Sequence, residues 1–183
     1  MTAIVPNKMY LNSNGQKFLD VTTSGGFGHV QKGHAVGFGD LDNDGDQDVF
    51  CVLGGAYEGD IYGDALFLNP YGNEKNWITL QLEGTTANKM AIGAKVKVVT
   101  QKANGQENSI YKTVSTGGSF GGNSLQLETG LDDATIVKSL EVIWPNQAQT
   151  KTVIENISIN KFYKLVEGAT ELEEQNRSAF NLN

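Results

Sequence analysis

The run Asp40-Leu41-Asp42-Asn43-Asp44-Gly45-Asp46-Gln47-Asp48 places five carboxylates at every second position of nine residues. The formal net charge of the whole chain is only −7, so this is a dense local concentration of negative charge. Carboxylates held close together repel one another, and ordering them removes part of their hydration. Because a divalent cation would offset both effects, the run predicts a metal-binding loop.

Calcium fits this donor set better than zinc, since every candidate ligand atom is an oxygen. Magnesium stays an alternative, although it demands octahedral geometry and keeps more of its water. The predicted ligands follow the alternation of a calcium loop: Asp40, Asp42 and Asp44 stand at positions one, three and five, Asp46 at position seven with its backbone carbonyl, and Asp48 at position nine.

The loop differs from an EF-hand. Gly45 at position six suits a sharp turn, but position twelve, where an EF-hand has a bidentate glutamate, is Cys51. The flanking residues 35–39 and 49–53 are β-branched, aromatic and glycine-rich, which favours strands over helices. We therefore expect a calcium loop that joins two strands.

Phe38-Gly39, the acidic loop and Gly55-Ala56 together resemble one FG-GAP/VCBS repeat, the calcium-bearing blade unit of integrin-α-like β-propellers. Tyr57 stands where a proline is common. The resemblance implies calcium as the cofactor, and it implies these ligands: side-chain oxygens from Asp40, Asp42, Asp44 and Asp48, and a backbone oxygen from Asp46. A propeller needs about four to eight blades, whereas this chain holds one calcium loop.

Upstream of the loop, residues 8–21 predict a hairpin around the turn signal Asn12-Ser13-Asn14-Gly15. This hairpin resembles the end of a preceding blade. Residues 22–34 form a glycine-rich loop with His29 and His34, for which we expect no metal or catalytic role, because suitably spaced partners are lacking.

After a linker over residues 70–76, the strands become longer and several alternate apolar with polar residues. Such alternation places one face in a core and the other in water. Seven strands are predicted, over residues 77–82, 94–100, 109–114, 124–128, 139–144, 150–154 and 162–166. Trp77 and Trp144 sit within apolar strands, so we expect core roles rather than a carbohydrate platform.

Several separate blocks of this second half resemble an ASPIC/UnbV domain, a family that commonly follows FG-GAP/VCBS repeats. The blocks are Asn76-Trp77-Ile78-Thr79-Leu80, Leu82-Glu83-Gly84-Thr85, Asn88-Lys89, Ile92-Gly93-Ala94, Gly117-Gly118-Ser119, Thr129-Gly130-Leu131 and Leu140-Glu141-Val142-Ile143-Trp144-Pro145. One departure is Asn146, which stands where the family usually has Ser-Gly after Trp-Pro.

We therefore predict an all-β chain. An antiparallel blade-like sheet with the calcium loop occupies residues 1–70, and it is packed on or linked to an antiparallel β-sandwich or open barrel over residues 76–167. A polar tail follows over residues 168–183. Its helix-forming residues leave a short helix and a frayed end as equal alternatives.

Composition excludes several classes of partner. With 14 basic against 21 acidic residues, a nucleic acid or an anionic membrane is disfavoured. No apolar run reaches membrane-spanning length, and residues 1–7 lack the features of a signal peptide. Cys51 is the only cysteine, and its apolar strand predicts a buried hydrophobe rather than a reactive thiol.

The favoured function is a non-catalytic calcium-binding module for recognition or adhesion, in which the ion orders a strand-loop-strand unit. Its partner would be a protein or a carbohydrate bound through the loops of residues 22–34 and 54–63, or by the face of the second domain. The resemblance implies an extracellular or cell-envelope setting. One alternative is a structural blade fragment that self-associates as a homo-oligomer, since a lone blade has exposed edges. A hydrolase is less favoured, because no nucleophile elbow or zinc signature is present.

Overall fold

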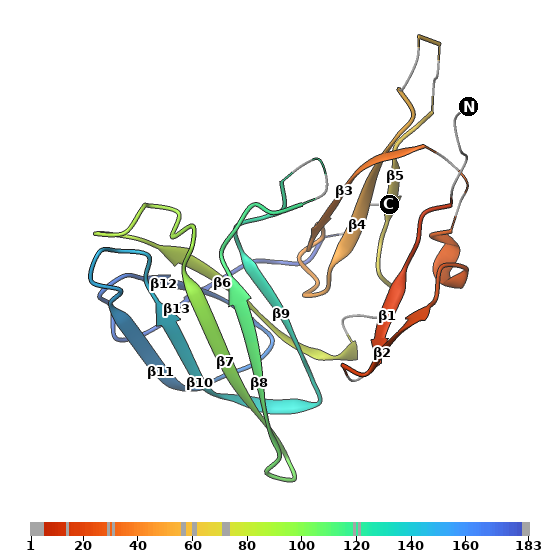
Figure 1. Ribbon diagram of the computed structural model, residues 1–183. Coiled ribbons are helices and arrows are strands. Elements are labelled where there is room, and N and C mark those ends of the chain that lie inside the picture. The colour runs from red at the N-terminus through yellow and green to blue at the C-terminus, as the bar shows by residue number, and fades with distance from the viewer. Residues whose placement is uncertain are drawn as a thin grey trace.

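A computed structural model describes residues 6–13, 15–28, 30, 32–55, 58–59, 62–70, 74–118, 120 and 122–180 (Figure 1). His29 and Tyr57 lie outside the described residues. The structure is nearly all β, as predicted, and the longest helical element in the described residues is the 3-10 turn η1 (Ser24–Gly26). Within those same residues, no helix has the length and apolar character needed to cross a membrane.

The first half contains a hairpin and a separate three-stranded sheet, which lie together on one side of the molecule (Figure 1). Strands β1 (Tyr10–Ser13) and β2 (Lys17–Asp20) form the antiparallel hairpin. The sheet has the antiparallel order β3 (Gly33–Gly39), β4 (Asp48–Leu53), β5 (Ala65–Phe67). The predicted hairpins over residues 8–21 and 35–53 are thus confirmed.

A small core lies against the inner face of the three-stranded sheet. Val49, Cys51 and Leu53 of β4 point into it, and Phe27 packs on Phe67 with ring centroids 5.2 Å apart. Burial raises the pKa of the Cys51 thiol, so this cysteine is a buried hydrophobe as predicted. The first half therefore has a core of its own, although a small one.

The second half is a sandwich of two four-stranded sheets. One sheet has the order β11-β10-β7-β8 and the other the order β13-β12-β6-β9. The strands are β6 (Asn76–Glu83), β7 (Lys95–Lys102), β8 (Glu107–Thr113), β9 (Leu127–Asp132), β10 (Ala134–Ile143), β11 (Lys151–Ile157), β12 (Lys161–Val166) and β13 (Glu173–Gln175). The predicted antiparallel sandwich is confirmed, with one addition: β12 pairs in parallel with β6.

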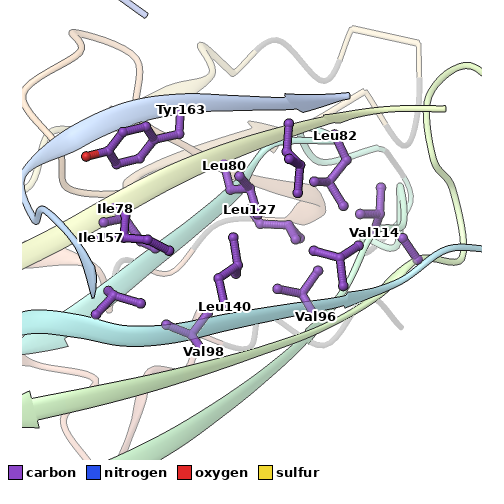
Figure 2. Close-up of a cluster of buried hydrophobic side chains, with 14 of the residues drawn as sticks. Ile78, Leu80, Leu82, Val96, Val98, Val114, Leu127, Leu140, Ile157 and Tyr163 are labelled. Carbon is purple, nitrogen blue, oxygen red and sulfur yellow. The ribbon is translucent and has the colours of Figure 1, made fainter. Parts of the chain in front are cut away.

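The main core fills the space between these two sheets (Figure 2). Leu80 and Leu127 come from one sheet, and Val98 and Leu140 face them from the other. Trp144 is fully buried there, and its indole Nε1 donates a hydrogen bond to Thr152 Oγ1 at 2.9 Å. The predicted core role of Trp144 is therefore confirmed.

Several bounds differ from the sequence-based expectation. Strand β9 begins at Leu127, three residues after the predicted start at residue 124, and β10 begins at Ala134, five residues before the predicted start at residue 139. The tail is neither a helix nor frayed at residues 173–175, because β13 pairs antiparallel with β12 and Leu172 packs against the main core. Pairing with an exposed strand edge thus overrides the helix propensity of a short polar segment.

Glu167, which directly follows β12, anchors the loop that follows β6. Its carboxylate accepts backbone N–H hydrogen bonds from Thr85, Thr86 and Ala87, each at 2.8 Å. The Thr86 hydroxyl and the Asn146 amide donate at 2.6 and 2.5 Å. Burial alone would raise the pKa of Glu167, but these hydrogen bonds outweigh it and hold the pKa below its ordinary value.

Replacing Glu167 by alanine should lower the free energy of unfolding by about 2–3 kcal/mol at neutral pH, because buried donors lose a charged acceptor. The depressed pKa means that this contribution is complete above the unfolded-state pKa, about 4.3, and declines progressively as the pH falls below it. Denaturant unfolding at pH 7 and pH 3.5 measures both effects. Glu155→Ala, an exposed glutamate of β11, is the control, and equal stability of Glu167→Ala and wild type would contradict the expectation.

Candidate metal centre

The acidic loop closes the hairpin between β3 and β4. Gly39 at the end of β3 pairs with Asp48 at the start of β4, and Leu41 N–H donates to Asp48 Oδ2 at 3.1 Å. The chain reverses through Asn43 and Gly45, whose φ angles are 57° and 98°. Both angles lie in the left-handed region, where asparagine and glycine are the favoured residues.

Three of the predicted ligands lie together, and hydrogen bonds within the loop position the carboxylates of two of them. Asp40 accepts the N–H of Asp44 at 3.0 Å on Oδ1 and that of Gly45 at 3.1 Å on Oδ2. Asp44 Oδ1 in turn accepts the N–H of Asp46 at 3.0 Å. One carboxylate oxygen from each of Asp40, Asp42 and Asp44 lies within 4.8 Å of the others.

The electrostatics of this group favour a cation. Burial raises the pKa of Asp40 to about 6, and the charges of Asp44 and Glu128 add to the effect. Burial, together with the charges of Asp44 and Asp48, also raises the pKa of Asp42. These shifts indicate that the ionised carboxylates lack sufficient compensation from the protein alone.

One atom in particular fits a hard cation. Asp42 Oδ1 is buried and accepts no hydrogen bond from the described residues. A buried carboxylate oxygen without a hydrogen bond is unfavourable, and carboxylate oxygens are the preferred ligands of Ca²⁺. The residues present therefore fit the cation that the sequence predicts.

The other two predicted ligands lie outside the group of three carboxylates. The Asp48 side chain is only 2% exposed and accepts the N–H of Asn69 at 2.9 Å, besides that of Leu41. It thereby ties the loop to the chain that leaves β5. Asp46 is also buried. Metal ligation by Asp46 and Asp48 stays a prediction. His34 lies exposed near the start of β3, at the end opposite the loop.

The second half approaches the loop at Gly45. A Cβ built on Gly45 would lie 1.9 Å from Cε2 of Trp77, so the two residues are in close contact. Trp77 also packs on Phe162, with ring centroids 4.8 Å apart. Trp77 is only half-buried and lies outside the sandwich core, so its predicted core role is wrong. It forms one of the contacts between the two halves.

Polar contacts surround the same loop. Glu128 accepts the N–H of Asp40 on Oε1 at 3.4 Å and the Gln47 side-chain amide on Oε2 at 2.6 Å. From the tail, the N–H of Phe180 donates to the Asp42 carbonyl at 2.8 Å. No local pattern marks Glu128 or Phe180 as loop contacts, because each lies far along the chain from the residue it touches.

Comparisons with known proteins divide the chain in the same way. The family model described as an FG-GAP-like repeat matches residues 5–51, which include the acidic loop. The model described as ASPIC and UnbV matches residues 84–172, which cover most of the sandwich. No curated protein matches the chain. The two resemblances predicted from the sequence, and their order, are therefore confirmed.

Replacing Gly45 by alanine should displace the loop from Trp77, because the new Cβ would overlap the indole and φ is unfavourable for alanine. We expect a loss of about 2 kcal/mol or more in the free energy of unfolding, measured by denaturant titration. Gly15→Ala is the matched control, since Gly15 also has a positive φ, of 71°, but no described atom within 4 Å of an added methyl group. Equal losses in the two variants would show that backbone strain, and not the Trp77 contact, causes the effect.

Proposed function

We propose that this chain, which carries an FG-GAP-like repeat followed by an ASPIC and UnbV domain, is a non-catalytic calcium-binding module for recognition or adhesion. These domains suggest an extracellular β-propeller-like module, and FG-GAP repeats are typical of extracellular or envelope proteins. The partner class is a protein or a carbohydrate, and the setting is extracellular or in the cell envelope.

The observation that carries the proposal is the group of three carboxylates with the buried Asp42 Oδ1. Side-chain oxygens of Asp40, Asp42 and Asp44 would hold Ca²⁺, joined by the Asp48 carboxylate and the Asp46 carbonyl. The ion would supply the positive charge that balances these groups. Because the loop joins β3 to β4, an ordered loop fixes the path of the chain from one strand to the next.

A binding role is supported over hydrolysis by the state of the candidate reactive groups. The thiol of Cys51 is buried within β4 and its pKa is raised, which makes it a poor nucleophile. Two of the clustered carboxylates, Asp40 and Asp44, accept backbone hydrogen bonds of their own loop. Such groups are arranged as ligands rather than as an acid and a base in separate environments.

Calcium should raise the melting temperature of the chelator-treated protein, and the Asp42→Ala/Asp44→Ala double variant should lose this response. At a calcium concentration 100 times the dissociation constant, the expected stabilisation is about 2.7 kcal/mol. Differential scanning calorimetry after thorough chelation measures it. Glu155→Gln/Glu171→Gln removes two exposed charges away from the loop and serves as the control.

Terbium gives a second readout, because Trp77 lies against the loop and can sensitise the luminescence of a lanthanide bound there. Calcium should displace the terbium, and Trp77→Phe should remove most of the signal although Trp144 is retained. Identical melting of the chelated and calcium-saturated wild type, together with no sensitised luminescence, would exclude the proposed site.

A second candidate function, self-association, is favoured by the outer face of the three-stranded sheet. Phe50 and Val52 of β4 are 41% and 37% exposed, and Leu66 of β5, which pairs with Phe50, is 44% exposed. Alternation along β4 places these side chains on the face opposite the small core. A contiguous exposed apolar face is typical of an interaction surface, and a second copy of the chain would present the same face.

If this face joins two copies, light scattering should give a mass that rises with protein concentration toward that of a dimer. Phe50→Lys/Leu66→Lys should keep the protein monomeric, because each lysine would place a charge within the apolar contact. Phe18→Lys, at an exposed aromatic of β2, is the control. A monomeric wild type throughout the concentration range would exclude self-association through this surface.

A further inference from the structure

We infer that the second half completes the cation site through Glu128, a positioning residue, so that calcium binding and the docking of the two halves stabilise each other. This inference rests on the calcium binding proposed above. It concerns a residue that lies outside the acidic loop and outside the matched FG-GAP-like repeat.

Glu128 is held at a fixed place by its own sheet. It belongs to β9, where it pairs with Thr79 of the neighbouring β6. From there its carboxylate reaches the loop near both ends. One oxygen accepts a hydrogen bond from the Asp40 N–H, and the other accepts one from the Gln47 side-chain amide. Asp40 directly follows β3 and Gln47 directly precedes β4. One side chain of the second half therefore holds both ends of the loop.

The charge of Glu128 distinguishes a role in cation binding from simple packing. A further carboxylate beside a group of acids adds electrostatic repulsion, which is larger at a partly buried site than in water. A neutral glutamine could accept the same backbone N–H without that repulsion. A glutamate at this place is favourable when a cation balances the combined charge.

Two further contacts make the docking specific. The indole of Trp77 covers Gly45, and the N–H of Phe180 binds the carbonyl of Asp42. Together with Glu128, these residues hold the loop from β6, from β9 and from the tail. Any factor by which docking tightens calcium binding must equal the factor by which calcium tightens docking.

The test uses Glu128→Gln and Glu128→Ala in the full chain, with the calcium dissociation constant measured by titration calorimetry. Loss of an outer partner of a metal ligand typically weakens affinity about 10-fold or more, and we expect that effect for both variants. Glu155→Gln removes the same charge from β11, in the other sheet, and should bind calcium like wild type. Circular dichroism establishes that each variant is folded. If Glu128→Ala does not fold, Glu128→Gln alone tests the inference.

Small-angle scattering supplies the readout for docking. Wild type should become more compact when calcium replaces chelator, whereas Glu128→Ala in calcium should scatter like chelated wild type. If wild type binds no calcium, the proposed function itself fails. If wild type binds calcium and the Glu128 variants bind it equally well, only the present inference is overturned. Equal weakening by Glu155→Gln would assign the effect to net charge and would also overturn it.

Discussion

The contact between Gly45 and Trp77 is the constraint on which the arrangement of the two halves depends. An indole ring lies where any residue with a Cβ would collide, so the acidic loop and strand β6 fit at one distance only. The ring is held from behind by Phe162, over which the Arg177 guanidinium lies at 5.0 Å from the ring centroid. The loop thus rests on a stack of side chains supplied by two strands and the tail.

This arrangement places the clustered carboxylates of the acidic loop beside the contact between the two halves. Backbone N–H groups of the loop compensate part of the charge of Asp40, but Asp42 Oδ1 is left buried without a hydrogen bond among the described residues. Hard cations complete such oxygen-rich loops elsewhere in proteins. The same loop that would bind the ion is therefore the part of the first half that meets the second.

Residue patterns within short segments were sufficient to predict the elements that interactions between sequence neighbours determine. The alternating aspartates, the glycine at the sharp turn and the period-two runs of β6 and β7 lead directly to the hairpin loop and the sandwich. The positions that could not be predicted are set by pairing across long stretches of sequence. Glu128, Phe180 and strand β13 carry no local signal, and Trp77 looked like a core residue because its strand is apolar on one face.

The parallel pairing of β6 with β12 has a consequence for how the chain reaches its native state. The strand that opens the sandwich pairs with β9 on one side, but its neighbour on the other side is β12, since Trp77 N–H binds Asn160 and Lys161 pairs with Ile78. Contacts of such high sequence separation slow folding. On a ribosome, the sandwich cannot be completed before β12 has been synthesised, and the acidic loop acquires its contact with Phe180 later still.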